Sequence, residues 1–274
     1  MPTTATSSSL ALLLFFAVPL AATSPQLDPY AGPKPIAVLI ETNPWAMVIG
    51  SDTPRVAVYE TGEVIYLKVV GESADYRHFQ LAPAAFSQLE RRLGPVLALA
   101  GLKSFYDIAP GVTDQPRSQF YLRDGAHEAT AAVYGLMAPT TRLPGYTSFP
   151  GAGAPDVLPR ELLEIDDARS TTWIPSYLEV ELWDYSYAPE ASVHWPKDWP
   201  GLDTAGVKRG TSFSIFLPGS QLPRLRALLA SRPAKGAVEV SGNKMMASYR
   251  YCFPGEPSWQ SAFAQASAKA ARRR

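Results

Sequence analysis

The sequence predicts an α+β protein in which antiparallel sheets are each covered by a helix. Three observations lead to this class. Runs that alternate apolar and polar residues are separated by glycine-containing dipeptides, which is typical of hairpins. Two other stretches repeat leucine or phenylalanine at helical spacing. Proline accounts for 26 of the 274 residues, about twice the usual share, which favours short elements over long helices.

The first half of the sequence is predicted to form a sheet that contains two hairpins. Strands are expected at residues 36–42, 46–50, 55–60, 63–70, 76–81, 118–122 and 127–134. Thr61-Gly62 and Asp124-Gly125 each join two alternating runs, and a glycine in a two-residue turn is a strong hairpin signal.

One helix is predicted to cover this first sheet, at residues 83–93. Phe86, Leu89 and Leu93 fall on one face of it and supply the apolar stripe that packs on a sheet. Because proline lacks a backbone N–H, Gly94-Pro95 is expected to end or kink the helix. A second short helix is then expected to follow to residue 100.

The second half repeats the order of strands, helix and hairpin. Strands are expected at residues 177–185, 211–217, 237–240 and 245–253, and helices at residues 158–167 and 220–232. Gly242-Asn243 is the predicted hairpin turn. Leu222, Leu225 and Leu229 have the same spacing as the apolar stripe in the first half. The sequence therefore leaves open a duplicated strands-helix-hairpin unit.

Composition divides the chain into six segments. They are a signal peptide (1–24), an extended leader (25–35), an N-terminal α+β domain (36–137), a linker rich in proline and glycine (138–157), a C-terminal α+β domain (158–260) and a basic tail (261–274). The linker is inferred because alternation stops there.

The N-terminus is predicted to direct export to the periplasm or the extracellular space. Nine apolar residues run from Leu10 to Val18, a length that suits a signal peptide and is too short to span a bilayer. The small residues Ala22-Thr23-Ser24 place the cleavage near residues 22–24, although no lysine or arginine precedes the apolar run. No second apolar run of about 18 residues follows, so no transmembrane helix is predicted. Arginine outnumbers lysine 17 to 8, which suggests a GC-rich bacterial genome.

Charge and cysteine content exclude several classes of protein. Lysine plus arginine and aspartate plus glutamate both number 25, so there is no basic excess to bind nucleic acid. The single cysteine, Cys252, excludes a disulfide framework and a cysteine-rich metal site. Its place in an alternating run predicts a buried strand cysteine.

No catalytic motif is supported by its surrounding sequence. The three histidines, His78, His127 and His194, lack the spacing of metal ligands. Ser241 and Lys244 match the S-x-x-K spacing of serine acyltransferases, but they flank a predicted turn, whereas that chemistry needs one helical turn. The sequence therefore predicts no catalytic residue, no metal site and no cofactor.

The unusual segment is an aromatic loop at residues 183–200. Its candidate ligand-binding residues are Trp183, Tyr185, Tyr187, His194, Trp195, Asp198 and Trp199. Aromatic faces with carboxylates between them suit a sugar or a peptide. The alternative is that the loop folds back and its tryptophans fill the edge of a small core. Arg250, on the last predicted strand, is a candidate ion-pair partner for an acidic residue of this loop.

The expected function is that of an exported, non-enzymatic binding or interaction module that uses the aromatic loop. Its partner is unknown; an envelope glycan, a peptide or another exported protein would fit. The alternative is a periplasmic hydrolase whose acid and base come from Glu190, His194 and Asp198 of the same loop. A structural role without a small ligand is the third possibility.

Overall fold

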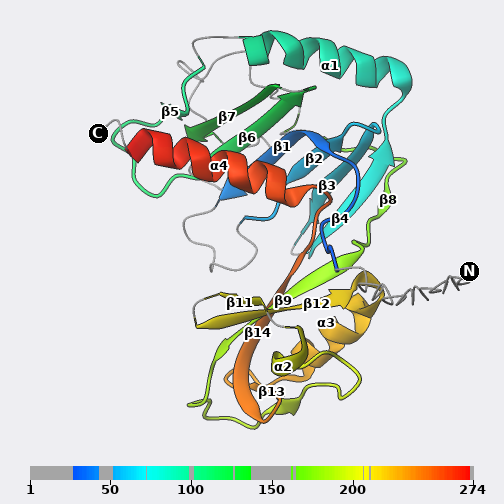
Figure 1. Ribbon diagram of the computed structural model, residues 1–274, viewed down its shortest axis with the longest axis vertical. Coiled ribbons are helices and arrows are strands. Elements are labelled where there is room, and N and C mark those ends of the chain that lie inside the picture. Colours follow the sequence, from blue (N-terminus) through cyan, green and yellow to red (C-terminus); the bar gives the residue numbers. More distant parts are fainter. Residues whose placement is uncertain are drawn as a thin grey trace, which may run out of the picture.

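The chain folds into two mostly antiparallel sheets, which form the two lobes of the computed structural model in Figure 1. The structure describes residues 27–42, 52–71, 73–98, 102–125, 127–136, 162, 165–205, 207–209 and 211–271. Two antiparallel sheets with packed helices confirm the predicted α+β class.

The first sheet has eight strands in the order β5-β7-β6-β1-β2-β3-β4-β8. Its strands are β1 (Pro35–Thr42), β2 (Val56–Tyr59), β3 (Glu63–Val70), β4 (Ser73–Gln80), β5 (Phe105–Asp107), β6 (Arg117–Asp124), β7 (His127–Tyr134) and β8 (Thr171–Thr172). Strands β2 and β3 form the predicted hairpin, as do β6 and β7. Gly62 and Gly125 adopt positive φ angles of 81° and 54° at the two turns, which explains the glycines there.

Two helices cover opposite faces of this sheet (Figure 1). On one face, α1 (Pro83–Ala98) buries Leu93 in a cluster with Leu39 and Phe120. On the other face, α4 (Glu256–Ala271) buries Trp259 in a cluster with Val38 and Tyr59. The sheet is therefore the middle layer of three.

Helix α1 runs through Gly94-Pro95 to Ala98, so of the two expected effects of this dipeptide, an end or a kink, the end is wrong. A proline costs a helix one backbone hydrogen bond, but it does not have to end the helix when packing holds the adjacent turn. Leu93, one residue before this dipeptide, is 1% exposed. We attribute the continuity of α1 to this anchoring.

The second sheet has six strands in the order β10-β13-β14-β9-β12-β11. Its strands are β9 (Tyr177–Asp184), β10 (Val193–His194), β11 (Val207–Arg209), β12 (Ser212–Pro218), β13 (Val238–Val240) and β14 (Asn243–Tyr251). The short helices α2 (Leu202–Ala205) and η3 (Gly219–Gln221) precede α3 (Leu222–Ser231), which buries Leu222 and Leu225. The last hairpin turns at Ser241-Gly242, one residue before the predicted dipeptide, since both residues have positive φ.

The two sheets differ in topology. The hairpin β6–β7 meets β1 through its first strand, whereas the hairpin β13–β14 meets β9 through its second strand. The strand orders therefore give the duplicated unit no support.

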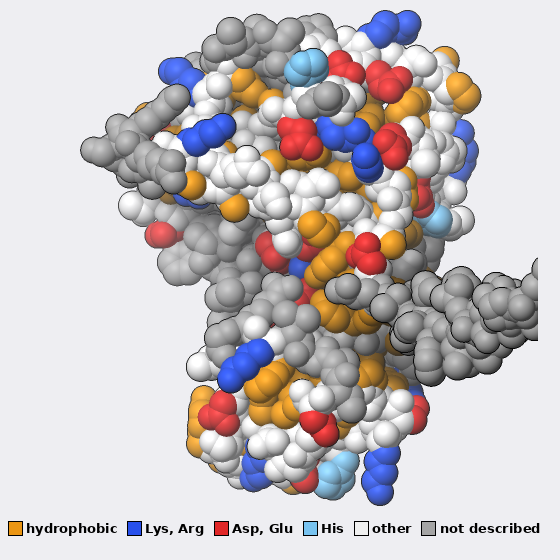
Figure 2. Space-filling model, viewed as in Figure 1, with side chains coloured by type: hydrophobic (Ala, Val, Ile, Leu, Met, Phe, Trp, Pro, Cys, Tyr) orange, Lys and Arg blue, Asp and Glu red, His pale blue; other side chains and the backbone are white. Residues whose placement is uncertain are grey.

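The lobes share one aromatic core. Tyr76 of β4 contacts Tyr251 and Phe253, with ring centroids 5.1 Å apart in each case. Trp173, which follows β8, lies 4.8 Å from Phe253. Figure 2 shows hydrophobic side chains gathered where the lobes meet. These aromatic contacts between the lobes make their junction a packed interface rather than a flexible linker.

For the C-terminal tail a frayed helix or a disordered segment is expected, and the structure has a helix as far as Ala271. Residues 261–271, predicted as a basic tail, continue helix α4, and Phe263 packs against the shared core.

Residues 165–167 are not helical, unlike the prediction; Asp166 there accepts hydrogen bonds from Tyr66 and Lys68. The signal peptide, the strand at 46–50 and the linker lie outside the described residues. No described helix is long and apolar enough to cross a membrane.

Candidate functional site

The tryptophans of the aromatic loop belong to the core. Trp195 and Trp199 are 8% and 7% exposed, and their rings meet edge to face with centroids 4.8 Å apart. The indole N–H of Trp195 donates to the Pro200 carbonyl at 2.9 Å, and that of Trp199 donates to the Gln221 side chain at 3.1 Å. The structural alternative is therefore confirmed for this pair.

The charged residues of the loop each pair with a different neighbour. Arg224 of α3 binds Asp198 through two hydrogen bonds of 2.6 and 2.8 Å and holds the pKa of that carboxyl below its usual value. Glu190 accepts a hydrogen bond from the Lys235 backbone. Among the described contacts, none joins Glu190, Asp198 and the exposed His194, so the acid and base of the hydrolase hypothesis are not assembled.

Tyr187 is the exposed aromatic residue of the loop, and it lies beside the half-buried Tyr185. Tyr187 is 76% exposed, and its ring meets Tyr185 edge to face at 4.9 Å. Trp183 is half-buried on β9, opposite Met246. These residues line none of the hollows found among the described residues. The loop therefore offers one aromatic pair rather than a concave site.

A buried charge cluster lies at the junction of the lobes. The side chain of Arg250 is 1% exposed and pairs with Glu179 at 3.1 Å and with Glu256, both of which are fully buried. Its partners are therefore not acids of the aromatic loop. Burial raises the pKa of Glu256, although the Arg250 charge opposes that rise. Tyr30 closes the cluster by donating to Glu179 at 3.1 Å.

This cluster is structural rather than catalytic. The side chains of Arg250, Glu179 and Glu256 are buried, although the Arg250 Nε also lies 3.5 Å from the exposed Asp52, and both buried carboxylates are occupied by hydrogen bonds. Cys252 beside it is 2% exposed, as predicted, and burial raises the pKa of its thiol. A buried thiol with a raised pKa is a poor nucleophile.

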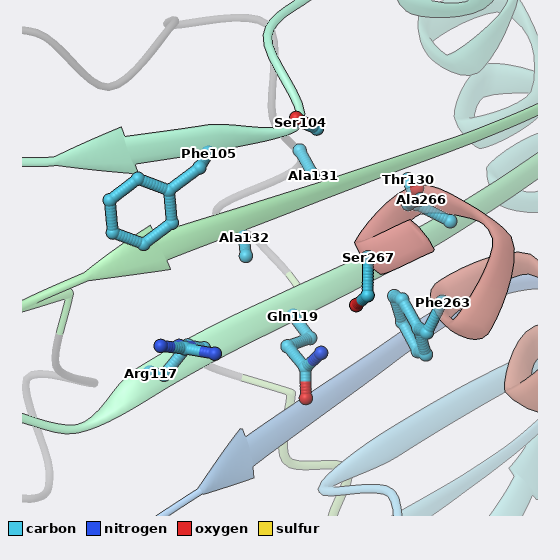
Figure 3. Close-up of a pocket in the computed structure, with 10 residues that line it drawn as sticks. All are labelled: Ser104, Phe105, Arg117, Gln119, Thr130, Ala131, Ala132, Phe263, Ala266 and Ser267. Carbon is cyan, nitrogen blue, oxygen red and sulfur yellow. The ribbon is translucent and has the colours of Figure 1, made fainter. Parts of the chain in front are cut away.

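A groove of about 510 Å³ lies between α4 and the β5–β7–β6 edge of the first sheet. We call it the α4 groove. It is lined by Ser104, Phe105, Arg117, Gln119, Thr130, Ala131, Ala132, Phe263, Ala266 and Ser267. Figure 3 shows Phe105 and Arg117 on one side, Phe263 and Ser267 of α4 on the other, and Gln119 and Ala132 between them. Its volume is within the range of small-ligand sites.

Strand alternation explains which side chains face the groove. On β6, Ser118 and Phe120 point toward α1 and are buried, so Arg117 and Gln119 point toward α4. The parallel register of β5 with β7 pairs Phe105 with Ala132, which places the phenylalanine on the same face.

The groove continues into a second hollow of about 400 Å³. Arg117 and Gln119 line both hollows, and Thr42, Asp114, Gln115 and Tyr134 complete the second. The two hollows are therefore neighbours that share Arg117 and Gln119.

Arg117 carries the charge of this site. Its guanidinium carbon lies 5.8 Å from the centre of the Phe105 ring, and Phe105 is 46% exposed. Among the described residues, no carboxylate forms an ion pair with Arg117. A guanidinium over an aromatic ring, beside an amide and hydroxyls, suits a ligand with an apolar part and an anionic group.

One further pair of residues has part of the geometry of an acid–base site. His78 Nδ1 lies 2.8 Å from a Glu63 oxygen, in a hollow also lined by Arg169 and Thr171. A carboxylate that orients a histidine is one part of a catalytic triad. Among the described contacts of His78, however, none reaches a hydroxyl, so a nucleophile is not engaged.

Sequence reasoning missed the α4 groove. Phe105 and Arg117 fall in a stretch without long alternation, and Phe263 falls in the predicted tail. The unassigned aromatic pair Phe105-Tyr106 was the available signal. Within the described residues, no group of three or more histidine, cysteine or acidic side chains is arranged to hold a metal ion.

Comparison of the chain with protein-family models, with curated proteins and with solved structures gave no match. The function is therefore argued from the site itself.

Proposed function

We propose that this is an exported, non-enzymatic binding module and that the α4 groove holds its ligand. The observation that carries the proposal is Arg117, a cation without an ion pair among the described residues, next to the half-exposed ring of Phe105. An exposed phenylalanine and an uncompensated charge at one concave site favour a partner that covers both.

The groove replaces the aromatic loop as the preferred site within the same proposed class. The tryptophans that motivated the loop are buried, and Asp198 is held by Arg224. The export part of the proposal rests on the apolar run at residues 10–18. An envelope glycan, a peptide or another exported protein remains the expected kind of ligand.

A thermal-shift screen of the purified protein tests this proposal. The screen would contain envelope glycans, peptides, nucleotides and divalent metal ions. A ligand present at about a hundred times its dissociation constant stabilises by about 2.7 kcal/mol, or roughly 5–10 °C in a chain of this size.

Matched variants identify the site. Phe105→Ala and Arg117→Ala should remove the shift, whereas Tyr187→Ala, which deletes an exposed aromatic ring in the aromatic loop, should leave it unchanged. A shift that Tyr187→Ala removes and the groove variants keep would return the site to the aromatic loop. Turnover of an ester, glycoside or peptide substrate would favour the hydrolase alternative.

A further inference from the structure

The strand that borders the α4 groove, β5, lies at the edge of the first sheet as far as the described strands extend. β5 is the last strand of the first sheet and, among the described strands, pairs on one side only, with β7. The Ala132 N–H donates to the Ser104 carbonyl at 3.0 Å, and the Ile108 N–H donates to the Tyr134 carbonyl at 3.1 Å. In a parallel ladder, alternate residues face the neighbouring strand. The backbone groups of Phe105 and Asp107 therefore point away from β7.

An edge of this kind is a template for another strand. Unpaired N–H and C=O groups along a sheet edge pair readily with an extended chain. Among the described residues, no strand pairs with the outer side of β5. A strand added there would lie about 4.8 Å from β5 and extend the sheet face that forms the floor of the α4 groove.

The positive charge of Arg117 in the groove favours an added strand that carries an acidic residue. The guanidinium carbon of Arg117 on β6 is 5.8 Å from the ring centre of Phe105 on β5, so the two side chains meet across the intervening strand β7. A long acidic side chain such as glutamate, on the groove face of an added strand, would extend over β5 toward this guanidinium. The nearest acid of β5, Asp107, accepts a hydrogen bond from the Ala109 backbone through Oδ1.

We propose that the ligand of the α4 groove is an extended peptide that adds to the outer edge of β5 and directs an acidic side chain to Arg117. This inference rests on the proposed function, because it names the ligand class of the same groove. Backbone pairing would supply affinity, and Phe105 with Arg117 would supply the preference for an apolar and acidic sequence.

The test uses nine-residue synthetic peptides. The array alternates β-branched with variable residues and places one glutamate at the centre of each peptide. The best binder is labelled with fluorescein, and its affinity for the purified protein is measured by fluorescence anisotropy. The same peptide with lysine in place of the glutamate, and a version N-methylated on alternate residues, are the ligand controls.

One pair of variants isolates the backbone contribution. Asp107→Pro removes an outward N–H without removing a bond to β7, and proline is tolerated on edge strands. Asp107→Ala removes the same carboxylate but keeps the N–H. Because one hydrogen bond is worth about fivefold in affinity, Asp107→Pro should weaken binding about fivefold or more relative to Asp107→Ala. Unchanged circular dichroism and melting temperature in both variants confirm that they fold.

The outcomes separate this inference from the proposed function. Loss of binding in Arg117→Ala and in Asp107→Pro, with retention in Asp107→Ala, supports both. Peptide binding that needs Arg117 but survives Asp107→Pro and N-methylation overturns strand addition and keeps the groove. Strand addition is likewise overturned, and the groove kept, if no peptide binds while small carboxylates such as phenylacetate bind in an Arg117-dependent way. If no ligand depends on Arg117 or Phe105, both proposals fail.

Discussion

Replacing Arg250 by leucine should destabilise the protein strongly, because the arginine is the only cation that the described structure places against two buried carboxylates. The exposed fractions of the side chains are 1% for Arg250 and 0% for Glu179 and Glu256. Removing one partner of a buried ion pair costs about 3–5 kcal/mol, since the remaining charge stays desolvated. Glu179 keeps the Tyr30 hydroxyl and Glu256 keeps the Phe253 N–H, so we expect the lower part of that range.

The unfolding free energy lost in Arg250→Leu should become smaller as the pH falls. Burial raises the pKa of Glu256 in the folded protein, and removal of the opposing Arg250 charge would raise it further. A carboxyl group whose pKa is raised by folding destabilises the folded protein most at pH values above that raised pKa, because the folded state then holds a buried charge. It costs nothing below its ordinary pKa, where both states are protonated. The destabilisation by Arg250→Leu should therefore shrink as the pH falls from neutral toward the ordinary pKa of a glutamate.

Urea unfolding monitored by tryptophan fluorescence measures this effect. Arg224→Leu is the matched control, because its ion pair with Asp198 is exposed and should change the unfolding free energy little. Adding Glu256→Gln to Arg250→Leu should recover part of the loss, since one of the two uncompensated charges is removed. Equal unfolding free energies for the Arg250→Leu and Arg224→Leu proteins, or a loss that does not vary with pH, would refute the reasoning.

Burial and the N-terminal sequence lead to three other predictions. Trp199→Ala should lower the unfolding free energy by about 3–5 kcal/mol, because it empties part of a packed core. Tyr187→Ala should change it by about 0.5 kcal/mol or less, because this ring is exposed. Denaturant titrations of both variants measure the difference. Cys252 should react with a thiol reagent only after unfolding; fast labelling of the native protein would contradict its burial. If the proposed signal peptide is removed, the mature protein should begin at about residues 23–25 by intact mass, and an uncleaved N-terminus would argue against the signal peptide.

Local patterns were sufficient for the long strands and the hairpins, but they did not reveal the short strands β5, β8, β10 and β11. The runs around Gly62 and Gly125 alternate with period two and end in residues that adopt positive φ, so sequence and conformation agree at each turn. The same logic failed at Gly94-Pro95, because packing of Leu93 against the sheet outweighs one missing hydrogen bond. Long-range contacts therefore decided the end of the helix, and a single sequence does not display them.

The candidate site was beyond local patterns for the same reason. Its floor comes from strands near residues 105–134 and its wall from helix α4, more than a hundred residues later. The aromatic loop was the predicted site because three tryptophans lie within 17 residues of sequence. Tryptophans grouped in this way occur in cores as well as on surfaces, and the contacts of Trp195 and Trp199 to Pro200 and Gln221 distinguish the two roles.

Helix α4 links the stability of the fold to the shape of the proposed site. It begins at Glu256, which is held by Arg250 at the junction of the lobes, and it then buries Trp259 against the first sheet. Its second half supplies Phe263, Ala266 and Ser267 to the groove. A change that loosens the first turn of α4 would therefore move one wall of the groove while Phe105 and Arg117 stay on the sheet. A ligand that bridges the two walls would oppose that movement. On this argument, ligand binding and the buried charge cluster stabilise the same docking of α4, although they lie at opposite ends of the helix.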